Sequence, residues 1–266
     1  SDDSSAIRLN NWINNVAQVL GSKLTEFGFC GDLGPASGTF WPYVKNVIDT
    51  VKNSNNVVGN GFYVAGNHEW SPGNFGSTSD SVKSNYTLNG NYINSENYVL
   101  YSFGVNSSNW NQIKQEDITK LGNYLASAPT NKPIFVLSHY PLHNINTRTI
   151  SNKDSVISTL NQYGNNHAII FLWGHNHTEA DSHYNQFYTT VLEGTNINFT
   201  YCSAGCMADD NYGGSDYVNA NDGIGLVANI GSSSVTLQYY QKDGTTVGSP
   251  LTIQLGGTPA PTTYTV

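Results

Sequence analysis

Charged side chains, cysteines and long apolar runs are all scarce in this chain of 266 residues. Charged residues make up 11% of the sequence, with 11 lysines and arginines against 19 aspartates and glutamates. Binding of a nucleic-acid polymer depends on cationic side chains that neutralise phosphates, so we expect no such partner. A small phosphorylated substrate remains compatible with this composition, because a metal ion can supply the positive charge. No apolar run is long enough to cross a bilayer, and we therefore expect a soluble chain without membrane contact.

The three cysteines are too few for a disulfide framework. Cys202 and Cys206 are close enough in sequence for one local bridge, and the alternative is three buried thiols. Asn, Ser, Thr, Gly and 17 Tyr take the place of charged residues, a composition that resembles secreted enzymes. The segment from Gly256 onward is rich in Thr and Pro and resembles an interdomain linker. We therefore expect one secreted, monomeric domain over residues 1–255 of a larger protein, followed by a tail at 256–266.

Hydrophobic periodicity predicts helices alternating with strands, followed by strands alone. Apolar residues recur at helical spacing in 9–20, 40–51, 115–125 and 154–162. Short apolar runs predict strands at 27–30, 62–65, 98–105, 134–137 and 168–173, and further strands at 187–192, 198–202, 225–230, 235–240 and 251–254. Residues 70–96 are polar without periodicity and are interpreted as a long loop or lid. This order predicts a layered α/β sandwich whose sheets pack face to face.

Four short polar motifs follow four of these apolar stretches. They are Gly31-Asp32, the run 66–69 (Gly-Asn-His-Glu), the run 138–141 (Ser-His-Tyr-Pro) and the run 174–177 (Gly-His-Asn-His). Strand ends are where an open α/β sheet places its ligand crevice, so these side chains can converge. Glycine directly before Asp32, Asn67 and His175 lets the chain turn beside a ligand without a side-chain clash. A set of nitrogen and oxygen donors without thiolates suits Zn, Mn or Fe better than Ca.

Each motif alone has a local explanation, since a Gly-Asp pair is usually a turn and a Gly-His-Asn-His run can be a polar turn. All of them in order, each after an apolar run, make coincidence a poor explanation. The chain resembles the calcineurin-like metallophosphoesterases over roughly residues 1–240. The signature of that family consists of Asp-x-His, Gly-Asp, Gly-Asn-His-Glu or Gly-Asn-His-Asp, a lone His, and Gly-His-x-His.

The resemblance implies an α/β/β/α sandwich of two mixed sheets flanked by helices, with a dinuclear centre of divalent Zn, Mn or Fe ions. By this resemblance Asp32 bridges both metals, Asn67, His139 and His175 complete one metal site, and His177 belongs to the other. His68 is the catalytic residue that acts on the phosphate. Glu69 is an outer residue that holds His68 or a metal ligand in place.

The expected Asp-x-His motif before the first helix is where the sequence departs from the family. The chain opens Ser1-Asp2-Asp3-Ser4, so Asp2 is the candidate for the family aspartate, with Ser4 in place of the histidine. The alternative is that Asp2 belongs to a frayed terminus in a chain that has lost its first strand. The metal site that includes His177 therefore lacks a complete ligand set in this sequence, and it could be empty.

The resemblance predicts a phosphatase or phosphodiesterase that hydrolyses a phosphomonoester or phosphodiester with a metal-activated hydroxide. One alternative is a secreted pseudoenzyme or binding module of the same fold with an incomplete metal centre. A surface-attached adhesion domain is the other, and it does not account for the ordered histidine motifs. His143, close to the 138–141 motif, is interpreted either as a solvated loop residue or as a substrate contact.

Overall fold

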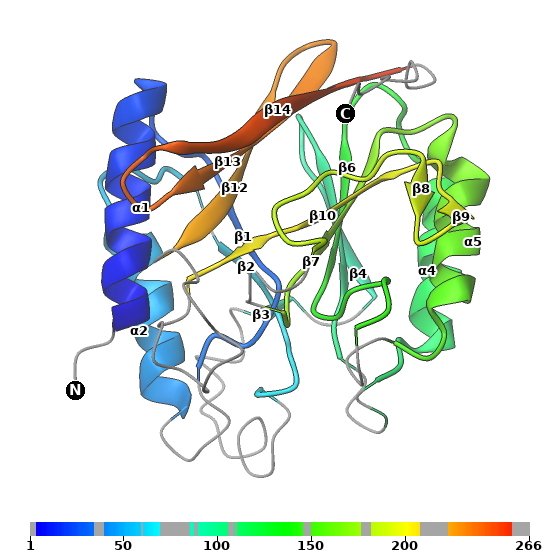
Figure 1. Cartoon of the computed structure of the whole chain (residues 1–266), viewed down its shortest axis with the longest axis horizontal. Helices are drawn as coiled ribbons and strands as arrows, with labels where there is room; N and C mark the ends of the chain where they lie inside the picture. Colours follow the sequence, from blue (N-terminus) through cyan, green and yellow to red (C-terminus); the bar gives the residue numbers. More distant parts are fainter. Residues whose placement is uncertain are drawn as a thin grey trace.

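The computed structural model describes residues 4–34, 40–59, 61–69, 86–87, 90–105, 109, 111–145, 150–176, 182–207 and 223–256. Within these residues the helices are α1 (Ser4–Leu20), α2 (Phe40–Asn53), α4 (Gln115–Leu125) and α5 (Lys153–Gly164). Each lies where apolar residues recur at helical spacing. Figure 1 shows α1 and α2 on one side of the molecule and α4 and α5 on the other. No helix among the described residues is long and apolar enough to span a membrane.

A five-stranded sheet packs against α4 and α5. Its order is β10-β7-β6-β5-β4, with bounds β4 (Asn91–Asn94), β5 (Val99–Phe103), β6 (Ile134–Ser138), β7 (Ile169–Trp173) and β10 (Thr200–Ser203). All pairings in it are parallel except that of β4 with β5. The central strands β5 and β6 are buried along their whole length, which is why their sequences are nearly continuous apolar runs.

Two further sheets lie between this sheet and the helices α1 and α2. A parallel sheet has the order β1-β2-β3, with bounds β1 (Phe27–Phe29), β2 (Gly61–Val64) and β3 (Tyr86–Thr87). An antiparallel sheet has the order β11-β12-β13-β14, with bounds β11 (Gly205–Cys206), β12 (Ile224–Ile230), β13 (Ser234–Gln241) and β14 (Thr246–Gln254). A small hairpin joins β8 (Val191–Leu192) to β9 (Thr195–Asn196).

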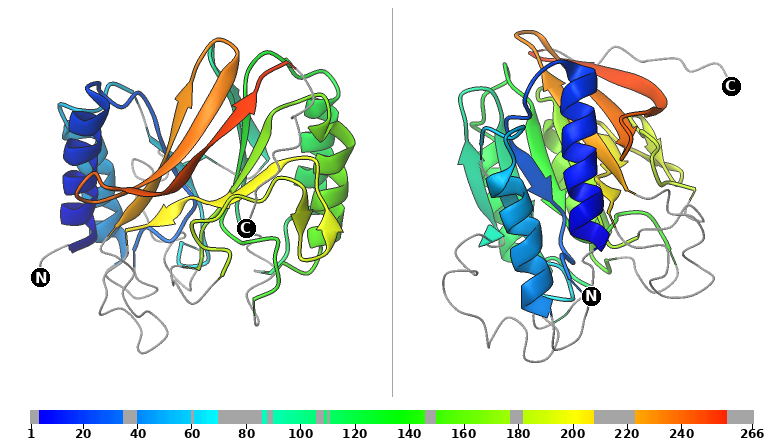
Figure 2. Two further views of the ribbon diagram at one scale, coloured as in Figure 1. Left: turned by 45° about the horizontal axis from the view of Figure 1, so that its top comes forward. Right: turned by 90° about the vertical axis from the view of Figure 1, so that its left-hand side faces the viewer.

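Two hydrophobic clusters hold these layers together. One joins α1 and α2 to β1, β2 and β13, with Trp12 and Tyr63 as its largest members. The other fills the space around the five-stranded sheet and includes Trp173, Tyr201 and Tyr239. The left view of Figure 2 shows the same succession of a helix pair, strands, and a second helix pair, and the right view shows α1 and α2 in front of the strands. The α/β/β/α sandwich predicted from the sequence is therefore confirmed.

The region from 70 to 96, interpreted from sequence as a loop, contains two short strands. β3 and β4 lie within it, while 70–85 and 88–89 are outside the described residues. β4 is an edge strand paired with β5, and its side chains are largely exposed, so its sequence Asn-Tyr-Ile-Asn carries little apolar signal. The strand expected at 187–192 is also shorter, with an isolated bridge at Tyr188 and then β8.

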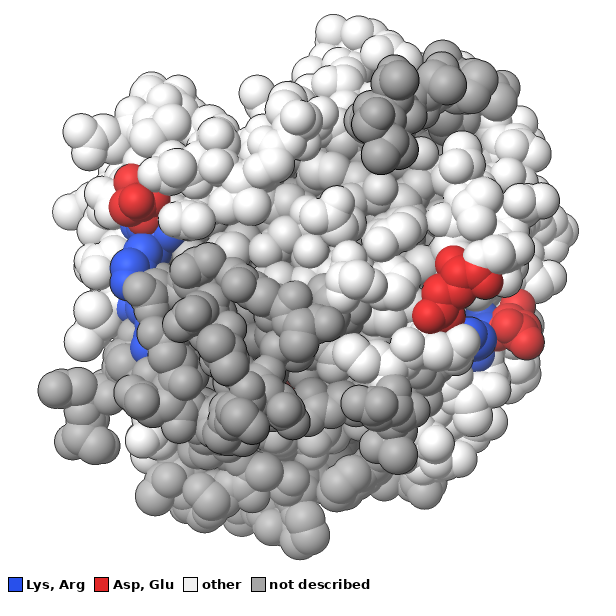
Figure 3. Space-filling view, viewed as in Figure 1, with Lys and Arg blue, Asp and Glu red and all other residues white. Residues whose placement is uncertain are grey.

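Two properties expected from composition have direct structural counterparts. No cysteine forms a disulfide, so the local bridge between Cys202 and Cys206 is absent; Cys30 and Cys202 are buried, whereas Cys206 is half-buried, so the alternative of three buried thiols holds for two of them. On the face shown in Figure 3, the charged residues that the structure describes gather at two margins, and the described residues visible between these margins are uncharged. The division into a domain at 1–255 and a tail stays a prediction, because residues 257–266 lie outside the described part of the chain.

Candidate metal centre

The candidate site is built on the carboxyl ends of four strands from two sheets. Asp32 follows β1, Asn67 follows β2, His139 directly follows β6 and His175 follows β7. Both pairs, β1 with β2 and β6 with β7, are parallel, so each pair ends at one edge of its sheet. The sheets touch at this edge, where Cys30 Sγ lies 3.7 Å from the carbonyl oxygen of Leu172. Parallel strands therefore deliver four polar side chains to one place.

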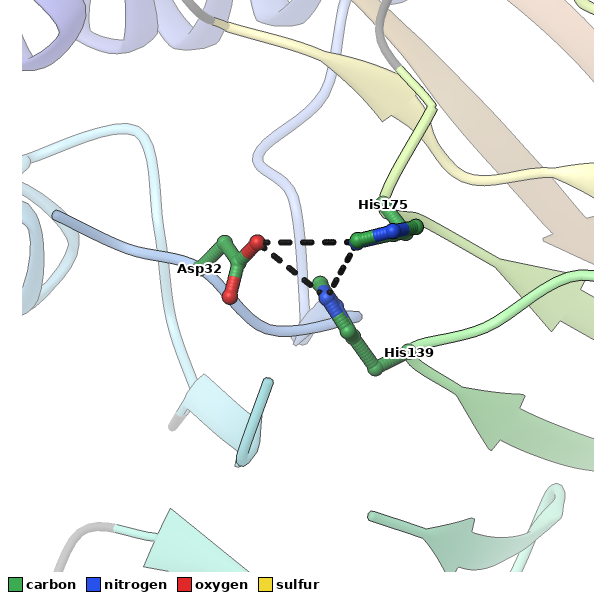
Figure 4. Close-up of side chains that lie close together, drawn as sticks. All are labelled: Asp32, His139 and His175. Atoms are coloured by element: carbon green, nitrogen blue, oxygen red, sulfur yellow. Dashed lines mark hydrogen bonds and ion pairs between the residues drawn. The ribbon is translucent and has the colours of Figure 1, made fainter. Parts of the chain in front are cut away.

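His139 lies at the centre of this group. Its Nε2 is 2.9 Å from Asn67 Oδ1, 3.0 Å from His175 Nδ1 and 3.1 Å from Asp32 Oδ2. His175 Nδ1 is 3.9 Å from the same oxygen of Asp32. Figure 4 shows the carboxylate and both rings pointing toward one another. The donor atoms of Asp32, His139 and His175 all lie within 4.8 Å of each other, an arrangement that could hold a metal ion.

The protonation pattern of His139 fits a cation in this group. Its Nδ1 lies 2.6 Å from the carbonyl oxygen of Cys30, which can only accept, so Nδ1 carries a hydrogen. In the neutral ring Nε2 then presents a lone pair, and this lone pair faces the oxygens of Asp32 and Asn67. Burying hydrogen-bond acceptors so that their lone pairs face one another costs free energy, unless a proton or a metal ion lies between them. A ligand histidine whose other nitrogen donates to a carbonyl is also the usual arrangement at metal sites.

The spacing of the donor atoms agrees with a transition-metal ion. Zn–N bonds are about 2.0–2.1 Å long, so two ligands around such an ion lie about 2.9 Å apart at a right angle and about 3.3 Å apart at the tetrahedral angle that Zn prefers. The separations from His139 Nε2 are 2.9–3.1 Å. Two imidazoles, one carboxylate and one amide form the mixed nitrogen and oxygen set that suits Zn, Mn or Fe. The residues present therefore fit a divalent transition metal.

Two of the proposed ligands adopt a left-handed backbone, which the sequence did not reveal. Asp32 has φ +56° and His175 has φ +67°, values that are uncommon outside glycine. Gly31 before Asp32 has φ +92°, and a Cβ there would lie 2.6 Å from His139 Nδ1. A Cβ on Gly66 would lie 2.7 Å from the backbone nitrogen of Asp32. The glycines thus permit the close approach of the loops, while Asp32 and His175 carry the backbone strain.

Glu69 joins two of the ligand loops through their backbones. Its carboxylate accepts the N–H groups of Asp32 (3.0 Å), Leu33 (3.1 Å) and Gly66 (2.7 Å). The side chain is fully buried. Burial, followed by the charge of Asp32, raises the pKa of Glu69. Glu69 therefore fixes the main chain on both sides of the site, while the role expected from the resemblance, holding His68 or a metal ligand, stays a prediction.

The pKa of Asp32 is lowered and the pKa of His139 is raised relative to their ordinary values. Burial of Asp32 acts to raise its pKa, but the neighbouring charge of His139 and the hydrogen bonds of the two histidines outweigh it and lower the pKa well below its ordinary value. Burial acts to lower the pKa of His139, and the charge of Asp32 outweighs this effect and raises it. In the metal-free protein the two groups therefore form an ion pair that a metal ion must replace.

His68 stands beside the ligand group. Its backbone N–H donates to Asp32 Oδ1 at 2.9 Å, and its Nδ1 lies 2.7 Å from the carbonyl oxygen of Gly34. Because that carbonyl accepts, Nδ1 carries a hydrogen and Nε2 is turned toward the site, 3.7 Å from Asp32 Oδ2. The ring is partly exposed, with 20% of the side chain accessible. It can therefore reach a bound molecule.

The structure brings together Asp32, Asn67, His68, Glu69, His139 and His175, while their assignment as ligands and catalytic residue stays a prediction. Asp2 and His177 lie outside the described residues. The sequence did not indicate two further groups of the site. These are the carbonyl groups of Cys30 and Gly34, which orient the rings of His139 and His68. A main-chain carbonyl leaves no trace in residue identity, so no motif could have indicated either.

His143 is buried, which contradicts its interpretation as a solvated loop residue. It is 0% exposed and its Nδ1 lies 2.7 Å from the hydroxyl of Tyr201. Its ring stacks on His183 at 4.0 Å and packs edge-on against Trp173 at 4.8 Å between centroids. Trp173 on β7 and Tyr201 on β10 thus enclose His143 in the core.

Comparison with known proteins identifies the family. The calcineurin-like phosphoesterase family profile matches residues 8–179, which include β1, β2, β6 and β7 and the loops after them. A search of curated proteins finds no significant match. The family match covers more than half of the 266 residues and spans the whole candidate site. The chain therefore belongs to the calcineurin-like phosphoesterase family.

Proposed function

We propose that this protein is a metal-dependent phosphoesterase that hydrolyses a small phosphomonoester or phosphodiester. The observation that supports it most is the convergence of Asp32 Oδ2, His139 Nε2 and His175 Nδ1, with Asn67 Oδ1 2.9 Å from His139. Family membership supports the same class of reaction. When bound, a divalent metal would polarise the phosphoryl group and lower the pKa of water, which is the chemistry that phosphoester hydrolysis needs.

The side chains of the site have distinct roles in this proposal. Asp32, Asn67, His139 and His175 would hold the metal, and the hydrogen bond from His139 Nδ1 to the Cys30 carbonyl fixes the ring so that Nε2 is the nitrogen available to a metal ion. His175 reaches the same place from β7. The substrate phosphate binds at the accessible side of this group, where the ring of His68 is exposed.

His68 acts on the departing group. With Nδ1 bonded to the Gly34 carbonyl, its Nε2 is the atom left to face the substrate. A protonated Nε2 donates to a phosphoryl oxygen or passes its proton to the leaving oxygen as the bond to phosphorus breaks. A positioned acid of this kind contributes typically about 10²–10⁴-fold to a rate. His68→Gln should therefore lower kcat far more than metal affinity.

The proposal is tested with the metal-loaded protein on p-nitrophenyl phosphate and on bis(p-nitrophenyl) phosphate. Turnover of either compound is expected, and the ratio of the two rates divides monoesterase from diesterase. His139→Ala should abolish turnover. The matched control is His167→Ala, because His167 also has a ring nitrogen near a carbonyl, at 3.3 Å from Pro129 O, but lies before the amino end of β7.

Metal analysis separates the enzyme from a pseudoenzyme or binding module of the same fold. An active enzyme should retain at least one equivalent of Zn, Mn or Fe after dialysis, and two equivalents would support a dinuclear centre. No tightly held metal together with no turnover in metal-replete buffer would refute the proposal. The His167→Ala variant should match the wild-type chain in both measurements.

We also propose a secreted, monomeric protein without nucleic-acid or membrane partners. Its support is compositional, with charged residues at 11% and acids outnumbering bases. Immunodetection in culture medium against cell lysate of the native host checks the location, and light scattering checks the oligomeric state. Retention inside the cell would contradict the first expectation.

A further inference from the structure

A third ring packs beside the two imidazoles of the candidate metal centre. Tyr140 directly follows His139, and the centroid of its ring lies 5.1 Å from that of His139 and 4.4 Å from that of His175. The centroids of the two imidazoles, whose rings are drawn in Figure 4, are 4.9 Å apart. The ring planes in the three pairs are inclined to each other by 62–72°, so each ring meets the other two edge to face. Aromatic side chains prefer this geometry, and the three rings therefore form one packed cluster.

The main chain around Tyr140 is anchored on both sides. The hydroxyl of Ser138 donates to the carbonyl oxygen of Tyr140 at 2.9 Å. Further along the chain, the N–H of Leu142 donates to the hydroxyl of Tyr201 on β10 at 2.8 Å. Pro141 lies between these anchors, and a proline restricts the backbone of the residue before it. Tyr140 is 8% exposed. Its ring is therefore a buried and rigid wall beside the imidazoles.

The plane of the His175 ring decides whether its Nδ1 can reach a metal ion. An imidazole nitrogen coordinates through a lone pair that lies in the plane of the ring, so a tilt of the plane turns the donor away. The torsion that sets this plane, χ2, has only a broad intrinsic preference, and packing must fix it. His175 also leaves β7 in a left-handed backbone with φ +67°, which places its ring where a regular strand would not.

We propose that Tyr140 is a positioning residue of the metal centre, whose ring fixes the plane of the His175 imidazole and so the direction in which Nδ1 coordinates. This inference rests on the proposed metal-dependent function, and it adds a side chain that acts through a ligand. The contacts that carry it belong to the ring of Tyr140, so phenylalanine should serve in its place. An aliphatic side chain should fill part of the space without fixing the plane. The alternative is that Tyr140 only fills space in the core.

The test compares Tyr140→Leu and Tyr140→Phe with the wild-type chain. The matched control is Tyr240→Leu, because Tyr240 is also 8% exposed but belongs to the hydrophobic cluster that joins α1 and α2 to the strands. Calorimetric titration gives the Zn²⁺ affinity, and the visible absorption of the Co²⁺-loaded protein reports the ligand geometry. Tyr140→Leu should bind Zn²⁺ about 10–100-fold more weakly, the loss typical when a group that orients a metal ligand is removed. Its Co²⁺ bands should shift or weaken, whereas Tyr140→Phe and Tyr240→Leu should match the wild-type chain in both measurements.

A second measurement needs no metal. In the metal-free protein the ring C–H signals of His175 in the NMR spectrum should be single and sharp for the wild-type chain and for Tyr140→Phe. They should broaden or double in Tyr140→Leu, because the imidazole plane is no longer held. Unfolding in urea shows whether Tyr140→Leu is folded. If it is not, Tyr140→Met replaces it in every measurement, because the longer, flexible side chain of methionine fills more of the gap.

Three results would overturn the proposal. Wild-type Zn²⁺ affinity and Co²⁺ bands in the aliphatic Tyr140 variant would show that the ring only fills space. An equal loss of affinity in Tyr240→Leu would assign the effect to general destabilisation. A loss in Tyr140→Phe as large as in Tyr140→Leu would assign it to the hydroxyl. Failure of the phosphoesterase proposal appears in the wild-type chain itself, as no bound metal and no turnover, whereas failure of this inference appears only between variants, so the two are distinguishable.

Discussion

Replacing Glu69 by glutamine tests whether one buried carboxylate holds the metal centre together. Its Oε2 accepts two backbone N–H groups, from Asp32 and Gly66, and its Oε1 accepts a third, from Leu33. Glutamine has nearly the same shape and can keep its carbonyl oxygen opposite the first two donors. Its NH₂ group must then face the N–H of Leu33. The change therefore removes one hydrogen bond and sets two donors against each other, with little change in volume.

The magnitude follows from these three contacts. A hydrogen bond to a charged group contributes about 1.5–3 kcal/mol, and a buried donor left without an acceptor costs about 1–3 kcal/mol. In the opposite direction, burial and the charge of Asp32 raise the pKa of Glu69, so a neutral side chain relieves part of the cost of burying a charge. The net loss of stability should be roughly 1–4 kcal/mol. Because the Asp32 loop is also released, metal affinity should fall about 10–100-fold.

Urea unfolding followed by tryptophan fluorescence gives the stability, and calorimetric titration with Zn²⁺ or Mn²⁺ gives the affinity. The matched control is Glu193→Gln, because Glu193 also accepts a backbone N–H, from Asn144 at 2.8 Å, but lies in the β8–β9 hairpin. The control should bind metal as the wild-type chain does. If Glu69→Gln keeps wild-type affinity and unfolds within about 0.5 kcal/mol of it, the carboxylate does not act as this clamp.

Two further predictions concern the same loops. Gly66→Ala would place a Cβ 2.8 Å from His139 Cε1, so it should destabilise the protein by about 1–3 kcal/mol and weaken metal binding. The control is Gly122→Ala in α4, whose Cβ would lie 3.4 Å from Thr159 and which should be neutral or stabilising. Equal urea midpoints for the two variants would contradict this prediction. In the metal-free protein the raised pKa of His139 means that its ion pair with Asp32 is complete below the ordinary histidine value of 6.5 and is lost as pH rises through the folded-state pKa. The free-energy difference between wild type and His139→Gln in chelator should therefore shrink from pH 6 to pH 9, and a constant or growing difference would refute it.

The sequence predicts those parts of the fold in which the pattern of apolar and polar residues follows directly from local burial. The apolar runs of β6 and β7 are continuous and largely buried, and each ends at a polar motif. The sequence therefore predicted both the strand and the position of the candidate site residues at its end. Helical spacing indicated α2 and α4 equally well, because each buries one face. β4 shows the opposite case, since its hydrogen bonds come from β5 and its exposed side chains need not be apolar.

The site was predictable in its side chains but not in its backbone. The motifs implied that His139 and His175 would meet, and their ring nitrogens lie 3.0 Å apart. The same motifs did not indicate the left-handed φ of Asp32 or the carbonyl group of Cys30 that sets the tautomer of His139. These features depend on the position of the main chain in a neighbouring strand, and that position is fixed by tertiary packing.

The arrangement of Asp32 and Glu69 links the stability of the fold to its chemistry. In a chain with so few charges, the buried carboxylate of Glu69 lies close to the partly exposed carboxylate of Asp32, and burial, followed by the charge of Asp32, raises the pKa of Glu69. Glu69 is compensated by three backbone N–H groups, whereas Asp32 faces the imidazoles of His139 and His175. The left-handed backbone at Asp32 adds strain of about 1–3 kcal/mol. A metal ion bound by Asp32, His139 and His175 would offset both the charge and the strain, so metal loading should raise the free energy of unfolding through the same side chains that are proposed to serve the reaction.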